Sequence, residues 1–328
     1  MHSDIEYVLC DMISRRILRI KIMQALYAYF KHGGNSSFKK AEQELSFSVE
    51  KAFDLYHYLL LLPIDIANYA ESRIELAKHK KVPTYDDLHP NTKFINNKII
   101  SQIKINIHLL HYVENKKMSW IIYPDLIKGI YNKTLESKVY SDYTSNDRNS
   151  YEGDKTFICN WYKDVVAQYE PLYQNLEEQS IYWNDEPEFI IGIIIKTIKR
   201  FVEKEGGASV LLPLYKSDED ESYAKKLLHK VVLNNKEFLA LIEKFSINWD
   251  IDRIAFLDIL LMQMAIAEAI EFSSIPVKVT LNEYLELAKY YSTSKSSLFI
   301  NGILDKVFMY LKENNQINKQ GRGLIGEI

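Results

Sequence analysis

Three arginines stand together at the start of the first helical pattern in this sequence. Arg15, Arg16 and Arg19 precede a run of apolar residues. At about 100° per residue, Arg16 and Arg19 project within about 60° of one another, and Arg15 falls close beside Arg19. A guanidinium can make two parallel hydrogen bonds to a phosphate and can stack on an unpaired base. These arginines are therefore candidate contacts to RNA.

The charge around these arginines is one-sided. Residues 12–40 contain seven Lys or Arg and no Asp or Glu, whereas residues 164–195 contain seven Asp or Glu and no Lys or Arg. Two interpretations of the arginines stay open: contacts to RNA, or surface salt bridges with the preceding acids Asp4, Glu6 and Asp11. The default interpretation of the acidic stretch is a solvated face.

Signatures of catalysis are missing. The sequence contains no G-x-S-x-G, no GxxxxGK[ST], no HExxH and no GxGxxG after a predicted strand. His108 and His111 share a helix face, but no third ligand stands nearby, so the pair favours a surface or structural role over a metal site. We expect no catalytic residue, no metal site and no cofactor, and therefore no enzyme.

The cysteines and the apolar runs indicate the compartment. Cys10 and Cys159 lie far apart, without Cys-x-x-Cys or Cys/His spacing, which favours a reducing environment over a disulfide framework. The first residues lack the pattern of a signal peptide, and no apolar run is long enough to span a bilayer. We expect a cytoplasmic protein with no membrane contact.

Helices are expected to position all of these residues. The chain has 328 residues, enough for two domains or one enlarged domain, and its 11 Gly and 8 Pro are too few for a turn-rich β architecture. The first helix, between Ser14 and Gly33, is apolar on more than one side, which is typical of a helix inside a bundle. A bend or break is expected at Pro63. Further helical patterns cover roughly 48–80, 94–113, 120–138, 155–180 and 187–204. Four more follow: one from near Ser222, one after Asp250 or Asp252 with an apolar face that includes residues 257–265, one over Val277–Tyr291, and a last one opened by Ser296 or Ser297.

Five segments resemble a known family. The string SRRILRIKIMQALYAY (14–29) resembles the opening helix of the NusB transcription antitermination factors. SYAKKLLHKVVLNNKEFLALI (222–242) is similar to a later NusB helix, and three NusB blocks then follow in order: NWDIDRIAFLDILLMQMAIAEAI, IPVKVTLNEYLELAKYYS and FINGILDKV. The patterns IP-x-x-V-x-x-NE-x-x-E-x-AK and F-[IV]-NG-[IV]-LDK are long and specific. The resemblance covers about residues 12–40 and 220–312.

This resemblance implies an all-α fold, a NusB-like helical bundle of two packed subdomains. Residues 60–215 have no counterpart in a minimal NusB and are expected to form a large helical insertion, similar to that of enlarged NusB proteins of the Bacteroidetes lineage. We predict four parts: an N-terminal NusB-like helix with its following segment (1–59), the insertion (60–215), a C-terminal NusB-like subdomain (216–313) and a flexible tail (314–328).

The resemblance also implies a function in transcription antitermination and termination. NusB proteins bind boxA-like single-stranded RNA together with NusE, a small-subunit ribosomal protein, in a complex that helps RNA polymerase to resist termination. When the RNA contacts of the family are transferred to this sequence, they are expected at Arg15, Arg16 and Arg19, and also at Lys295 and Phe299. Phe299 could stack on a base, although an aromatic residue at a helix start is also a common core residue. Lys295 is inferred from its charge.

The expected partner surface lies on the C-terminal subdomain. The resemblance implies that NusE binds near Glu268, Asn282 and Glu283. Asn282 and Asn301 have the alternative interpretation of buried, hydrogen-bonded contacts between helices. Gly302 lies inside a predicted helix, where glycine costs about 1 kcal/mol relative to alanine, so we expect close backbone packing there.

Two other functions compete with this one. NusB-like domains also occur fused to ribosomal RNA cytosine methyltransferases, but such an enzyme needs a Gly-rich cofactor loop after a strand and a nucleophilic cysteine, commonly after proline. Neither Cys10 nor Cys159 follows a proline, and no βαβ pattern is present. The other alternative is a helical protein-interaction module without RNA binding, which predicts that neighbouring carboxylates neutralise Arg15, Arg16 and Arg19.

Overall fold

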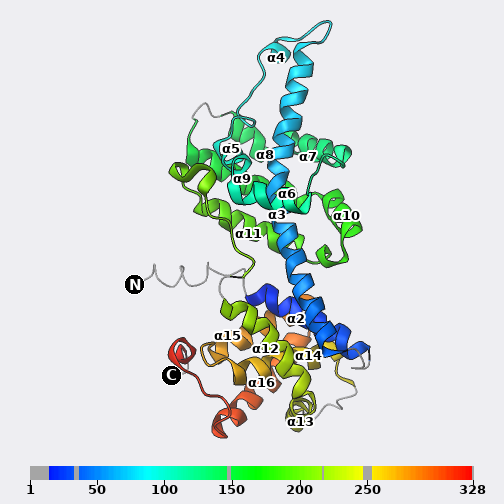
Figure 1. Ribbon diagram of the computed structural model, residues 1–328, viewed down its shortest axis with the longest axis vertical. Coiled ribbons are helices and arrows are strands. Elements are labelled where there is room, and N and C mark those ends of the chain that lie inside the picture. Colours follow the sequence, from blue (N-terminus) through cyan, green and yellow to red (C-terminus); the bar gives the residue numbers. More distant parts are fainter. Residues whose placement is uncertain (1–14, 33–36, 146–148, 216–217, 247–252, 327–328) are drawn as a thin grey trace. The chain divides into compact units, whose positions relative to one another are not determined.

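The computed structural model describes residues 15–32, 37–145, 149–215, 218–246 and 253–326. Every regular element in these ranges is a helix, which confirms the all-α prediction (Figure 1). None of the described helices is both long enough and apolar enough to cross a bilayer. The α-helices are α2 (Arg15–Lys31), α3 (Phe38–Lys78), α4 (Tyr85–Leu88), α5 (Lys98–Lys104), α6 (Ile107–Lys116), α7 (Pro124–Glu136), α8 (Lys138–Thr144), α9 (Tyr151–Asp164), α10 (Glu170–Gln179), α11 (Pro187–Arg200), α12 (Asp218–Leu233), α13 (Asn235–Phe245), α14 (Phe256–Glu271), α15 (Val277–Tyr291) and α16 (Ser296–Glu313). Short 3-10 helices lie at Val166–Gln168, Ile181–Trp183, Glu203–Ala208 and Gly321–Leu324.

The chain divides into two compact units. The terminal unit comprises Met1–Val49 and Tyr215–Ile328, and the central unit comprises Glu50–Leu214. α3 contributes its first turns to the terminal unit and the rest to the central unit. It continues through Pro63, so the break expected there does not occur. A proline inside a helix costs about 3 kcal/mol, but the leucines just before Pro63 are buried, and each buried leucine contributes about 1.5–3 kcal/mol.

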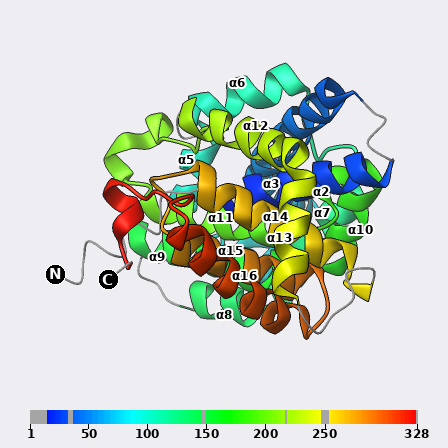
Figure 2. The same cartoon turned by 90° about the horizontal axis from the view of Figure 1, so that it is seen from below.

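α14 forms the centre of the terminal unit. Its sequence is apolar on all sides, and every residue from Leu260 to Ala269 is buried. A helix without a polar face gains stability only when it is covered all round. Figure 2 shows the helices that cover it, and α2, α12, α13, α15 and α16 all contact α14.

The C-terminal segment packs on the end of α14, unlike the flexible tail expected for 314–328. Ile317 is buried. The Lys319 ammonium donates hydrogen bonds to the carbonyl oxygens of Ala269 and Phe272, at 2.8 and 2.9 Å. The last carbonyl groups of a helix have no partner within it, and a lysine can bind them. This contact explains why the polar segment is held in place.

Gly302 does not make the close contact expected from its position inside α16. It is exposed, and a Cβ added to it would meet no atom within 4 Å. We therefore expect Gly302→Ala to raise the free energy of unfolding by about 1 kcal/mol, because alanine has the higher helix propensity. Gly207→Ala should have the opposite effect, because its Cβ would lie 2.4 Å from the carbonyl oxygen of Ile105. Urea unfolding of both variants tests this, and a loss of stability in Gly302→Ala would contradict it.

Aromatic residues fill the core of the central unit, and their polar atoms are hydrogen-bonded. The Trp161 indole donates to the Thr134 hydroxyl at 2.8 Å, and the Tyr162 hydroxyl donates to the carbonyl oxygen of Leu59 at 2.8 Å. Both aromatic side chains are fully buried. Such bonds remove the cost of burying a polar atom and leave the full gain of apolar burial.

His57 gives the central unit a dependence on pH. Burial lowers the pKa of this histidine to about 4, against an ordinary value of 6.5. Below pH 6.5 the unfolded chain therefore binds a proton that the folded chain excludes, and stability falls as the pH falls toward 4. At 1.36 kcal/mol per pKa unit, the loss is up to about 3 kcal/mol. Urea unfolding between pH 7 and pH 4 should show a flatter profile for His57→Gln, and an unchanged profile would contradict the assignment.

Candidate nucleic-acid interface

The three arginines occupy the first turns of α2 in the terminal unit, but they differ in burial. The side chains of Arg15 and Arg16 are 25% and 38% exposed, whereas that of Arg19 is 1% exposed. The neighbours Ile17 and Leu18 are buried as well. Because α2 is covered on more than one side, one of its three arginines lies inside the bundle.

Arg19 forms an ion pair in the core of the terminal unit. Its Nε and Nη2 atoms donate to the two carboxylate oxygens of Glu268 on α14, at 2.8 and 2.7 Å. Glu268 is fully buried. Its carboxylate also accepts hydrogen bonds from the hydroxyl groups of Tyr223, Thr280 and Tyr284. A buried ion pair of this kind is stable only when such additional bonds satisfy the remaining lone pairs.

The two charged groups set each other's protonation. Burial by itself would raise the pKa of Glu268, but the charge of Arg19 and its hydrogen bonds lower it below the ordinary value. Burial would likewise lower the pKa of Arg19, but the charge of Glu268 raises it well above the ordinary value. Both groups therefore stay charged at neutral pH.

Arg16 is held by a carboxylate at the surface. Its Nε and Nη2 atoms donate to Glu283 on α15, at 2.9 and 2.7 Å. These hydrogen bonds raise the pKa of Arg16 above its ordinary value. Glu283 also accepts a hydrogen bond of 3.3 Å from Arg19. One carboxylate thus links the exposed arginine to the buried one.

Arg15 makes a looser contact. Its Nε atom donates to Asp220 on α12 at 3.2 Å, and its guanidinium lies 5.2 Å from the centre of the Tyr223 ring. Each of the three arginines therefore has a carboxylate partner within the terminal unit. The acids Asp4, Glu6 and Asp11, expected as alternative partners, lie outside the described residues.

Lys295 and Phe299 lie near the opposite end of α14. Lys295 is exposed just before α16, and Phe299 is half-buried. The next residue after Lys295, Ser296, donates a hydrogen bond to Asp258 in the first turn of α14. Asp258 and Glu268 are ten residues apart, which is about 15 Å along a helix. The structure therefore gathers the three arginines but not Lys295 and Phe299.

The residues expected to bind a protein partner also differ in exposure. Glu268 cannot serve as a surface contact, because it is fully buried and its oxygens bind groups of the same unit. Asn282 is exposed, and Glu283 is half-buried beside it on α15. Asn282 is therefore not the buried contact that the alternative interpretation required. Asn301 is half-buried and donates a hydrogen bond to Asp305 within its own helix, α16.

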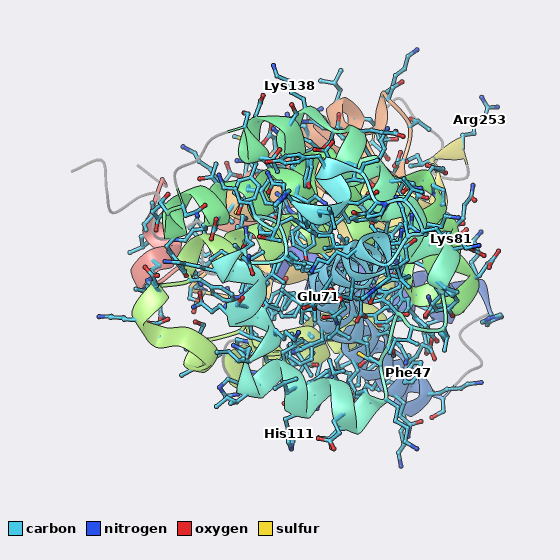
Figure 3. The ribbon with its side chains drawn as sticks, turned by 90° about the horizontal axis from the view of Figure 1, so that it is seen from above. Phe47, Glu71, Lys81, His111, Lys138 and Arg253 are labelled. Carbon is cyan, nitrogen blue, oxygen red and sulfur yellow. The ribbon has the colours of Figure 1, made fainter. Side chains whose placement is uncertain are left out.

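The histidine pair lies at the surface of the central unit. His108 and His111 are both exposed on α6, and Figure 3 shows the His111 side chain pointing outward. In the part of the chain that the structure describes, no three His, Cys, Asp or Glu side chains are placed to hold a metal ion.

The residues of α12 and α15 that surround the three arginines of α2 were not predicted from the sequence. Asp220, Tyr223 and Tyr284 bind the guanidiniums or their carboxylate partners. One signal pointed to this cluster. Glu268 stands in the otherwise apolar run MAIAEAI, and a carboxylate buried among apolar residues requires a cation.

Comparisons with known proteins agree on one family. A model described as the NusB family matches residues 194–308. The transcription antitermination protein NusB of Salinibacter ruber is 35% identical over 139 residues, which is 40% of this chain and 87% of that protein. Its namesake in Natranaerobius thermophilus is 39% identical over 118 residues, 35% of this chain and 81% of that protein. The one in Chloroherpeton thalassium is 42% identical over 100 residues, 30% of this chain and 47% of that protein. No solved structure matches the chain.

Proposed function

Because this chain belongs to the NusB family, we propose that it acts in transcription antitermination by binding boxA-like single-stranded RNA together with NusE. It would do so in the cytoplasm, as part of the RNA polymerase antitermination complex, and the role requires no catalysis. The relatives named above are transcription antitermination proteins. Family membership is the observation that carries the proposal, and the start of α2 supplies its chemistry.

Arg15 and Arg16 keep donors available for phosphate. Arg15 uses only its Nε atom for Asp220, and Arg16 uses Nε and Nη2 for Glu283. Among the described residues, no acceptor binds the Nη atoms of Arg15 or the Nη1 atom of Arg16. The first turn of α2 contains no acidic residue, and the unpaired N–H groups of a helix N-terminus favour an anion. RNA phosphates would be bound at these donors.

Arg19 is assigned a positioning role in this proposal. Its guanidinium is buried against Glu268 and lies 3.3 Å from Glu283. It would orient Glu283, which in turn holds the Arg16 guanidinium in place. Arg15 and Arg16 are therefore the arginines proposed to contact RNA, and Arg19 acts through its neighbours.

The paired carboxylates explain why a second protein would be needed. Each arginine faces an acidic partner, so the cluster offers RNA little excess positive charge. We infer that the chain alone binds RNA weakly, and that NusE supplies further contacts near Asn282 and Glu283. Lys295 and Phe299 would contact RNA only if the strand follows α14 for about 15 Å.

A fluorescence titration of labelled boxA-like RNA with the intact chain tests the RNA contact. At low salt we expect binding, and the logarithm of the affinity should fall with the logarithm of the salt concentration by roughly 0.7 per phosphate contact. Two contacting arginines would contribute a slope of about 1.4. Absence of binding at low salt, both with and without NusE, would contradict the proposed function.

A second candidate function follows from the same ion pairs. A protein-interaction module without RNA binding would neutralise its arginines with neighbouring carboxylates, and such pairing is present for Arg15, Arg16 and Arg19. This function predicts NusE binding without any RNA binding. The titration therefore distinguishes the two candidates.

A further inference from the structure

Two turns of the central unit hold isoleucines out in solvent. Ile121 and Ile122, between α6 and α7, are 77% and 71% exposed, and Ile181, just after α10, is 77% exposed. We call these three residues the isoleucine patch. Full burial of such a side chain is worth about 1.5–3 kcal/mol, so their exposure leaves a substantial apolar surface uncovered. Exposed apolar groups that cluster mark interaction sites more often than scattered ones.

The first turn is held rigidly. Trp120 is fully buried and stacks on Tyr58, with ring centres 3.8 Å apart. Its indole donates to the carbonyl oxygen of Tyr58 at 2.8 Å, and the Tyr58 hydroxyl donates to the carbonyl oxygen of Ser119. The residue before Ile121 is therefore anchored in the core. The isoleucines face solvent because the turn is fixed in this conformation.

The second turn, which contains Ile181, packs against the same residue, Tyr58, through Trp183. The ring of Trp183 lies 5.9 Å from that of Tyr58, and its indole donates to the carbonyl oxygen of Lys51 at 2.7 Å. The backbone N–H of Trp183 donates to the carbonyl oxygen of Ser180, which closes the turn around Ile181. Both turns thus flank Tyr58, and α7 and α10, which adjoin them, lie on one side of α3 (Figure 1).

The isoleucine patch is acidic on the side of Ile181. Residues 164–195 contain seven Asp or Glu and no Lys or Arg, whereas Lys117 and Lys128 flank the turn with Ile121 and Ile122. Glu177 and Glu178 lie in the last turn of α10, a few residues before Ile181, and all three residues are exposed. Within the described residues, no ion pair engages Glu177 or Glu178. The patch therefore has carboxylates beside it whose charge is not neutralised.

We propose that the isoleucine patch binds a basic amphipathic segment of another protein, with apolar side chains on the isoleucines and Lys or Arg side chains beside Glu177 and Glu178. Charge complementarity selects this occupant. RNA and an anionic membrane surface would both be repelled by the carboxylates, and isoleucine offers no aromatic face for a base. A second copy meeting patch to patch would bring like charges together. This site is built from residues of the central unit, whereas the proposed RNA site is built from residues of the terminal unit.

The probe for this site is a synthetic amphipathic helix of lysine and leucine, with a glutamate and leucine helix of the same length as its counterpart. The intact chain should bind the lysine helix and not the glutamate helix, with an affinity that falls as salt rises. Ile121→Ser with Ile122→Ser should weaken binding by at least about tenfold. Glu177→Gln with Glu178→Gln should weaken it at low salt and reduce its salt dependence. The control Val82→Ser removes an apolar side chain that is 84% exposed elsewhere in the central unit. It should leave the affinity for the lysine helix unchanged.

Several results would overturn the proposal. One is an affinity for the lysine helix that neither pair of substitutions changes, and another is equal binding of the two helices. A sedimentation experiment in which the intact chain dimerises and the double isoleucine variant does not would assign the patch to self-association. Binding of anionic vesicles or of RNA that requires Ile121 and Ile122 would also contradict it. All substituted residues are exposed, so folding, followed by circular dichroism, should be unaffected.

Discussion

Replacing Arg19 by methionine is expected to lower the free energy of unfolding of the terminal unit by about 3–5 kcal/mol. The substitution leaves the fully buried carboxylate of Glu268 without its cation. Arg19→Lys should lose less, because the charge remains but the fork that reaches both oxygens of Glu268 does not. Urea unfolding followed by circular dichroism measures these differences.

Arg16→Met is the matched control for this prediction. Its side chain is 38% exposed, and pairs at the surface contribute at most about 1 kcal/mol. A pH series adds a second test. The pKa of Glu268 is lowered on folding, so the stabilisation by its ion pair is complete above the ordinary pKa of 4.5 and is lost as the pH falls below it. Equal losses for Arg19→Met and Arg16→Met at neutral pH would show that the buried pair does not organise the unit.

Substitutions of the two partners of the surface ion pair between Arg16 and Glu283 are expected to change RNA affinity in opposite directions. Arg16→Ala removes a phosphate contact, so it should lower RNA affinity and reduce the salt slope by about 0.7. Glu283→Gln removes the carboxylate that occupies Nε and Nη2 of Arg16. It should raise RNA affinity, because a negative charge beside the bound phosphate is removed while the glutamine amide oxygen can still accept a hydrogen bond from Arg16. Arg16→Lys should keep most of the slope while losing affinity, since lysine cannot supply two parallel hydrogen bonds.

Lys236→Ala is the matched control for charge in these RNA titrations. Lys236 is exposed on α13, and its removal changes the net charge as Arg16→Ala does. It should leave the salt slope unchanged. If Arg16→Ala and Lys236→Ala have the same small effect, the arginine acts only through net charge, and the assignment of a phosphate contact is wrong.

Local patterns were sufficient to predict much of the terminal unit. The predicted helix Val277–Tyr291 has the bounds of α15, because Pro276 cannot continue a helix and sets its start. Ser296, one of the two serines predicted to open the last helix, is the first residue of α16. The apolar run around residues 257–265 likewise indicated α14. In each case the signal lies within a few residues of the helix it defines.

The central unit was harder to predict, because polar caps interrupt its apolar periodicity. The pattern over 94–113 suggests one helix, but the structure has two, α5 and α6. The Asn97 side chain accepts hydrogen bonds from the first N–H groups of α5, and the Asn106 side chain accepts one from Leu109 in α6. An asparagine is tolerated inside a helix and favoured at its start. The residue type alone therefore does not reveal the break.

The candidate site was predicted only in part, for a different reason. The sequence places Arg15, Arg16 and Arg19 together on one helix, and the structure keeps them together. Their partners come from helices far along the chain: Arg19 and Glu268 are 249 residues apart. Charge patterns within a short window cannot reveal such pairs. The burial of Arg19 follows from the covering of α2 by other helices, which depends on the whole bundle.

Coupling between RNA and NusE is the most direct test of the central claim. RNA affinity is measured with and without saturating NusE, and NusE affinity is measured with and without saturating RNA. We expect each ligand to raise the affinity for the other by the same factor, in the range of about 5–150-fold. Equal RNA affinity with and without NusE would contradict a joint role of the two proteins in antitermination.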